Sequence, residues 1–144
     1  METPIVEVIS GIDASVYVID CVPNMTPLQI HENAIPLVEM IRSKHPVTPI
    51  VFVESIIYMK SFLDDSTRIN TTNKNLALKS EYEKMIGKGF SNIYYTNADG
   101  AIGNDHEGTV DGVHFTDLGF IRFADFMISK FEEFKLMKAI IKSR

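Results

Sequence analysis

The chain has 144 residues, of which 45% are hydrophobic and 23% charged, with a formal net charge of −5 and a pI near 5.3. An acidic chain of this length predicts one domain, residues 1–144, and disfavours nucleic acid or an anionic membrane as a partner. Its single cysteine, Cys21, excludes an internal disulfide and a cysteine-rich metal site. No apolar run is long enough to span a bilayer and no signal-peptide pattern opens the chain, so the sequence assigns no compartment.

The first half of the chain reads as helix, strand and helix. Residues 4–10 have the pattern of a short helix, and residues 15–20 form an apolar, β-branched run typical of a strand buried on both faces. A loop over residues 21–25 contains Asn24. Thr26 and Pro27 then provide the cap chemistry of a helix that extends to about residue 44.

The second half repeats the alternation. Residues 50–53 predict a second buried strand, followed directly by Glu54 and Ser55. Residues 56–70 are interpreted as a loop, with Asn70 or Thr71 capping a helix that ends near residue 88. Residues 92–96 predict a third strand, residues 97–114 a long polar loop, and a last helix begins near Thr116.

Strands alternating with helices predict an α/β fold with a parallel sheet and helices on both faces. Three strands are few for a doubly wound domain, so we expect the first strands of the complete fold to be missing from this chain. A sheet without them would have an open edge, which predicts poor solubility or a homodimer that covers the edge.

Ligands of open α/β sheets bind beyond the carboxyl ends of the strands. Three loops lead to this edge, and they carry Asn24, then Glu54 and Ser55, and finally Asp111 and His114. The topology alone therefore predicts that these side chains gather at one place.

An Asp three residues before a His can provide the orienting acid and the general base of a nucleophilic hydrolase. Imidazole titrates near neutral pH, and an Asn amide can stabilise a developing oxyanion. By spacing alone the alternatives remain open: Asp111 and His114 could precede a helix as cap residues, Asn24 could be a turn residue, and Glu54 a structural acid.

A metal-assisted hydrolase is a weaker alternative, because His106 lies in the same loop as Asp105, Glu107, Asp111 and His114. These residues lack the spacing of known metal motifs. We therefore predict no metal and no cofactor.

The run from Gly108 through Asp111 and His114 to Gly119 resembles the last conserved block of the SGNH/GDSL hydrolases. Residues 17–27, with a Pro23–Asn24 turn, and residues 49–54 resemble other parts of a bacterial subgroup of that superfamily. The resemblance implies a flavodoxin-like three-layer fold and hydrolysis of carboxylic esters, often acetyl groups on carbohydrates. It also implies that His114 is the base, Asp111 its orienting acid and Asn24 an oxyanion-hole donor.

The family's Gly-Asp-Ser-type block, which carries the nucleophile, has no counterpart here. Ser55 is the least poor candidate for the nucleophile, because it lies at the sheet edge. None of the serines, which include Ser10, Ser15, Ser61 and Ser66, has the sequence setting of a nucleophile motif. We therefore expect an ester hydrolase acting on a small-molecule ester or acetylated carbohydrate, with its serine upstream of this chain. The alternative is a catalytically inactive, flavodoxin-like binding or assembly module.

Overall fold

A parallel sheet organises residues 1–141, which are the residues that the computed structural model describes. Strands β1 (Tyr17–Ile19), β2 (Ile50–Val53) and β3 (Ile93–Thr96) lie in the order β1-β2-β3, and β2 is paired in parallel with both neighbours. The three predicted strands are confirmed, although β1 is shorter than the predicted range 15–20.

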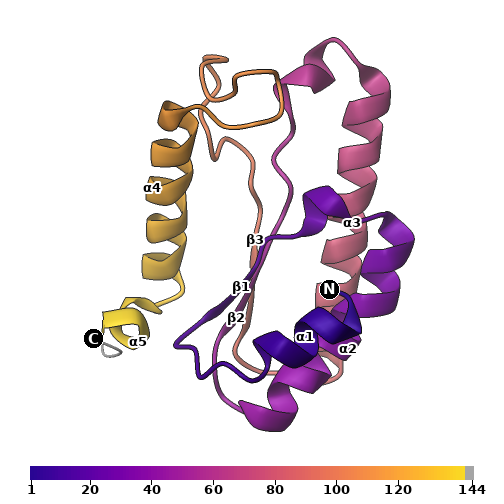
Figure 1. The fold of residues 1–144 in the computed structure, drawn as a ribbon, viewed down its shortest axis with the longest axis vertical. Helices are drawn as coiled ribbons and strands as arrows, with labels where there is room; N and C mark the ends of the chain where they lie inside the picture. The colour runs from indigo at the N-terminus through magenta and orange to yellow at the C-terminus, as the bar shows by residue number, and fades with distance from the viewer. Residues whose placement is uncertain (142–144) are drawn as a thin grey trace.

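Helices cover both faces of this sheet (Figure 1). On one face lie α1 (Thr3–Ile9), α2 (Pro27–Lys44) and α3 (Asp65–Gly87), and on the other lies α4 (Asp117–Glu133), followed by α5 (Met137–Ile141). The fold is therefore the predicted three-layer α/β/α arrangement. Among the described residues, no helix is both long and apolar enough to cross a membrane.

Strand β2 is the centre of the core. Its side chains alternate, so that Ile50 and Phe52 pack toward α1, α2 and α3 while Val51 and Val53 pack toward α4. All four are inaccessible to solvent. A strand covered on both faces needs an unbroken apolar run, which explains the absence of a polar residue in β2.

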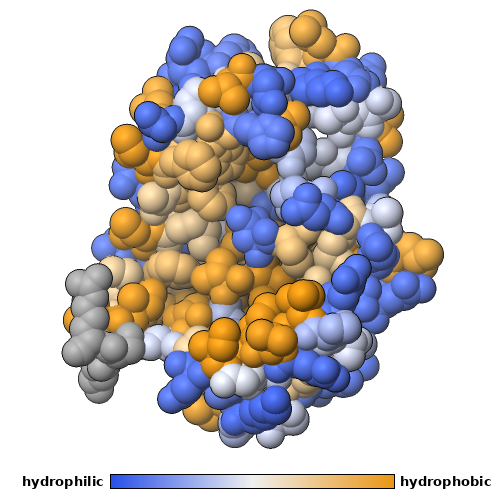
Figure 2. All heavy atoms as spheres, viewed as in Figure 1, coloured by the Kyte–Doolittle hydropathy of each residue, from blue (hydrophilic) through white to orange (hydrophobic). Residues whose placement is uncertain are grey.

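Strand β1 differs from the prediction, because only one of its faces is fully covered. Tyr17 and Ile19 are buried against the helices of the first layer, whereas Val18 is 44% exposed on the opposite face. The reason is that α4 packs over β2 and β3. Figure 2 shows hydrophobic residues across the centre of the visible face and over α1. The homodimer predicted from the sheet edge stays a prediction.

The predicted start of the third helix was wrong. Helix α3 begins at Asp65, not at residue 70 or 71, because the Asp64 carboxylate accepts hydrogen bonds from the backbone N–H groups of Ser66 and Thr67. A short 3₁₀ helix, η2 (Met59–Phe62), precedes it in the segment predicted to be a loop. The caps predicted for α2 and α4 are confirmed at Thr26 and Thr116.

Candidate active site

Loops from all three strands surround one cavity of about 350 Å³ at the carboxyl edge of the sheet, here called the His114 cavity. The structure brings four of the residues singled out from the sequence to this place, namely Asn24, Glu54, Ser55 and His114. The other lining residues are Asp20, Pro23, Ile56, Tyr58, Val113, Phe115 and Phe123.

Asp111 and His114 form a hydrogen-bonded pair beside this cavity. Oδ2 of Asp111 lies 2.7 Å from Nδ1 of the His114 ring. Oδ1 accepts hydrogen bonds from the backbone N–H groups of Val113 at 3.0 Å and His114 at 2.8 Å. The backbone N–H of His114, and then its imidazole, hold the pKa of the Asp111 carboxyl well below its usual range. The carboxyl group is therefore an anion at neutral pH.

The pairing decides which ring nitrogen is available for chemistry. A carboxylate next to Nδ1 favours the tautomer in which Nδ1 carries the proton, so Nε2 is left with its lone pair. The His114 side chain is 78% exposed and the Asp111 side chain 53% exposed. A reacting group can therefore approach the imidazole directly.

Backbone contacts hold the Asp111–His114 loop in place. Gly112 has a φ of +85°, and a Cβ atom there would lie 3.1 Å from the backbone nitrogen of Lys60. That nitrogen donates a hydrogen bond to the Gly112 carbonyl. At the start of α4, a side chain at Gly119 would collide with the Gly108 carbonyl, 2.1 Å from the position of its Cβ. Glycine is thus needed at both positions for the close approach of two backbones.

Asn24 also lines the His114 cavity. It ends a single 3₁₀ turn, η1 (Val22–Asn24), which directly follows β1 and contains Pro23. Within residues 1–141 its side-chain amide has no hydrogen-bond partner, and the residue is exposed. The amide is thus available to donate to a ligand in the cavity.

Glu54 and Ser55 line the cavity but are each engaged with the protein. The Tyr95 hydroxyl donates to the Glu54 carboxylate, and burial followed by this bond raises the pKa of the Tyr95 phenol far above its usual value. Ser55 is buried, and its hydroxyl donates to the Ile56 carbonyl at 3.1 Å. The Asn75 amide bonds both the N–H and the carbonyl of Ser55. These bonds fix the end of β2 in position.

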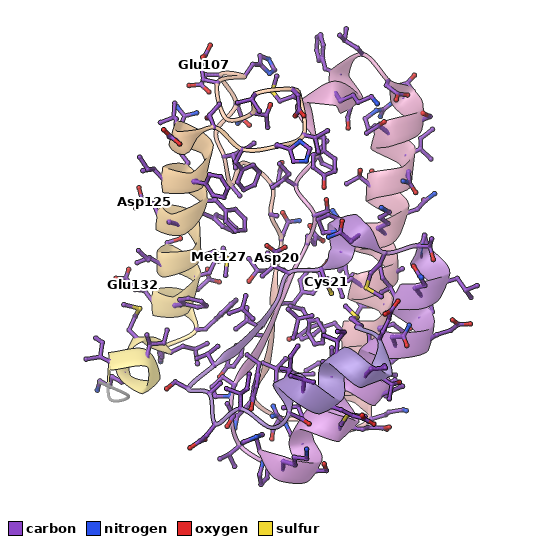
Figure 3. The ribbon with its side chains drawn as sticks, in the orientation of Figure 1. Asp20, Cys21, Glu107, Asp125, Met127 and Glu132 are labelled. Carbon is purple, nitrogen blue, oxygen red and sulfur yellow. The ribbon has the colours of Figure 1, made fainter. Side chains whose placement is uncertain are left out.

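Sequence reasoning missed Asp20, which follows β1 directly and belongs to the cavity. It lies on the side of the sheet that α4 faces (Figure 3). Desolvation raises the pKa of its carboxyl, opposite to the shift at Asp111. The rule that identified Glu54, a polar residue just after a buried strand, applies equally to Asp20 and could have found it. Tyr58 and Phe123 gave no such signal, because only tertiary packing places them here.

The metal-assisted alternative lacks a ligand set in the described part of the chain. Across residues 1–141 no group of three His, Cys, Asp or Glu side chains is placed to hold a metal ion. His106 lines a different cavity from His114, and its Nδ1 lies 2.9 Å from the sulfur of Met59.

The model of the GDSL-like lipase/acylhydrolase family matches residues 1–132. The chain belongs to this family. A crystal structure of a protein described as a GDSL-like lipase, from Bacteroides ovatus, matches with a TM-score of 0.91 and 34% identity. The match covers 96% of this chain and 40% of that one, so the chain spans less than half the length of that protein.

A second solved structure, the salicylyl-acyltransferase SsfX3 from a tetracycline biosynthetic pathway, matches with a TM-score of 0.69 and 17% identity. This match covers 85% of this chain and 38% of that one, and at such low identity it supports the fold alone. A comparison with curated proteins gave no match.

Proposed function

We propose that this GDSL-family chain supplies the base, the orienting acid and one oxyanion donor of a carboxylic ester hydrolase. The observation that carries the proposal is the hydrogen bond of 2.7 Å between Asp111 and His114, at a cavity that also contains the unpartnered amide of Asn24. The family match supports the same chemistry.

In the proposed reaction, Nε2 of His114 accepts the proton of a serine hydroxyl as the serine oxygen attacks the carbonyl carbon of the ester. Asp111 keeps the ring in the required tautomer and stabilises the imidazolium that forms. The amide of Asn24 donates to the oxyanion of the tetrahedral intermediate. When the intermediate collapses, His114 gives the proton to the leaving alcohol, and water then releases the acid by the same steps.

We place the nucleophilic serine outside residues 1–141. Ser55 is the one serine of the described residues that lines the His114 cavity. The residue is buried and its hydroxyl donates to the Ile56 carbonyl, so its proton is bonded there and not to His114. In this proposal a longer form of the protein supplies the nucleophile.

The proposed substrate is a small-molecule ester, with an acetylated carbohydrate as one such substrate. The cavity of about 350 Å³ is within the range of small-molecule sites. The description of the first solved structure as a GDSL-like lipase supports an ester substrate.

A non-catalytic binding or assembly module is the second candidate. It is favoured by the bonding of Ser55, because within the described residues no serine hydroxyl is hydrogen-bonded to His114. Both candidates have the same fold and differ only in whether a nucleophile reaches His114.

A fluorophosphonate probe, which reacts covalently with activated serines, separates the two candidates. The protein expressed from its complete coding sequence and the chain of residues 1–144 would each be labelled, digested and analysed by mass spectrometry. We expect labelling of a serine outside this chain, abolished by His114→Ala and retained by the matched control His31→Ala. Labelling of Ser55 would overturn the proposed location of the nucleophile. No labelling of either protein would favour the binding module.

A further inference from the structure

The amide of Asn24 can donate to an oxyanion only if the short turn that carries it is held in place. Helix η1 contains three residues. Inside the turn, the Asn24 N–H donates to the Cys21 carbonyl at 3.1 Å, and the Met25 N–H donates to the Val22 carbonyl at 3.1 Å. Short 3₁₀ turns have poorer hydrogen-bond geometry than α-helices. Because the side chain of Asn24 has no hydrogen-bond partner within residues 1–141, its position depends on the backbone of this turn.

A tertiary hydrogen bond reaches this turn from helix α3, which packs against η1 (Figure 1). Nζ of Lys74 donates to the carbonyl of Pro23 at 2.9 Å, although the two residues are 51 positions apart in the sequence. A hydrogen bond from an ionised donor is roughly twice as strong as one between neutral groups. The Pro23 carbonyl belongs to the peptide unit that also contains the N–H of Asn24. Lys74 therefore fixes one side of this peptide unit, and the bond to Cys21 fixes the other.

The partner of Lys74 differs from the partners of other helical lysines. Lys84 and Lys130 bond carboxylates three residues away on their own helices. Lys74 is half-buried, bonds a backbone carbonyl of another element, and does not line the His114 cavity. Ordering a lysine side chain costs conformational entropy, and lysines usually extend into solvent. The contact of Lys74 thus acts on the turn and not on a bound ligand.

The next residue of α3, Asn75, holds a second loop of the site. Its side-chain amide bonds the N–H of Ser55 at 3.0 Å and the carbonyl of Ser55 at 2.8 Å. Two consecutive residues of one helix therefore anchor the segment that follows β1 and the segment that follows β2. Helix α3 thus sets where Asn24 lies relative to the cavity wall formed by Glu54 and Ser55.

We propose that Lys74 is a positioning residue for the oxyanion donor, which acts through the Pro23 carbonyl to keep the Asn24 amide where the tetrahedral intermediate needs it. This inference rests on the proposed ester hydrolase function, in which Asn24 stabilises the oxyanion. Donors to an oxyanion act over about 2.7–3.1 Å, so a small displacement of the turn weakens the stabilisation of the intermediate and has little effect on substrate binding.

The first test needs no nucleophile. Amide hydrogen exchange in the chain of residues 1–144 is followed by NMR for the parent and for Lys74→Met, which keeps an apolar side chain and removes the ammonium group. We expect the N–H of Asn24 to exchange about fivefold faster in the variant, while the N–H of Ser55, which Asn75 holds, keeps its rate. Unchanged exchange at Asn24, or an equal increase at Ser55, would overturn the proposal.

Lys88 gives the matched control, since it is exposed at the C-terminal end of the same helix. Lys88→Met removes the same charge from α3 and should leave exchange at Asn24 as in the parent chain. If this variant speeds the exchange of Asn24 as much as Lys74→Met does, the charge of the helix matters and the bond to Pro23 does not, which would refute the proposal.

A double-mutant cycle connects Lys74 to catalysis in the protein expressed from its complete coding sequence. Lys74→Met should lower the turnover number for 4-nitrophenyl acetate about five- to tenfold, with a nearly unchanged Michaelis constant. In the Asn24→Ala background the same substitution should have little further effect, because the donor that Lys74 positions is gone. A loss of equal size in both backgrounds, or a rise in the Michaelis constant alone, would contradict the assigned role.

The two tests separate a failure of this inference from a failure of the proposed function. If the complete protein hydrolyses no ester, the hydrolase proposal fails and the catalytic role of Lys74 fails with it, even where the exchange of Asn24 depends on Lys74. If hydrolysis depends on Asn24 but neither the exchange nor the turnover number responds to Lys74→Met, the hydrolase proposal stands and the inference about Lys74 is wrong.

Discussion

Two His–carboxylate pairs in this molecule have nearly the same hydrogen bond and quite different surroundings. Nδ1 of His114 lies 2.7 Å from Asp111, and Nδ1 of His31 lies 2.6 Å from Glu81. The first pair is within one exposed loop, whereas Glu81 is 2% exposed and joins α3 to His31 of α2, with Lys84 as a second partner. His31 is 44% exposed on the surface of α2.

The difference lies in what each imidazole faces. His114 lines a cavity that contains an unpartnered amide, Asn24, and is reached by loops from all three strands. His31 does not line the His114 cavity. A hydrogen bond to a carboxylate thus occurs both in a packing contact and in a candidate catalytic pair, and the two are distinguished by burial and by the cavity that the histidine lines.

The largest expected effect is on activity. His114→Ala should lower the hydrolysis of 4-nitrophenyl acetate by at least about 10³-fold, because it removes the proposed base. His31→Ala should leave the rate unchanged. The measurement uses the protein expressed from its complete coding sequence, and a similar loss in both variants would remove the distinction between the two pairs.

Asn24→Ala should lower the same rate by about 10²- to 10³-fold, since it removes one donor to the oxyanion. The Michaelis constant should change little, because the donor acts mainly on the transition state. If the constant rises while the turnover number stays the same, Asn24 binds the substrate and does not stabilise the intermediate.

A feature of the fold or of the candidate site could be predicted from the sequence when its contacts join residues that are close together in the chain. Asp111 and His114 were recognisable because their contact spans three residues and needs only a glycine turn between them. Asp64 also has the residue type of a helix cap. The residues that follow it are polar and form no apolar stripe, so the sequence did not indicate that the helix begins there. The exposure of Val18 depends on where α4 packs, and no pattern within β1 contains that information.

The Glu81 pair should matter for stability and not for rate. Glu81→Gln should lower the free energy of unfolding by about 1–3 kcal/mol, because a buried group loses its charge-assisted bonds to His31 and Lys84. Urea unfolding measures this effect. Glu83→Gln, an exposed neighbour on α3, is the control and should change the free energy little.

The smallest expected effect is on the loss of stability at acidic pH. Burial acts to raise the pKa of Glu81, but the hydrogen bonds and charges of Lys84 and His31 outweigh it and hold the pKa below its usual value. A carboxyl with a lowered pKa stabilises the fold fully above its unfolded pKa of about 4.3, and this stabilisation is lost as the pH falls below that value.

The loss of stability between pH 6 and pH 3, measured by urea unfolding, should therefore be smaller in Glu81→Gln than in the parent chain. The lowered pKa of Asp111 gives the same direction, but its exposure makes the effect of Asp111→Asn weaker. An equal or larger change in Asp111→Asn would mean that the exposed pair also contributes to stability.

The backbone hydrogen bond from the Lys60 N–H to the Gly112 carbonyl joins two segments that are far apart in the sequence. It ties η2 to the turn that carries His114. If this contact opens, both segments become less ordered together, so the exchange rate of the Lys60 amide proton with solvent should report on the order of the whole site. Transferring the Asp111–His114 loop to another scaffold would therefore require the segment of residues 56–62 to move with it.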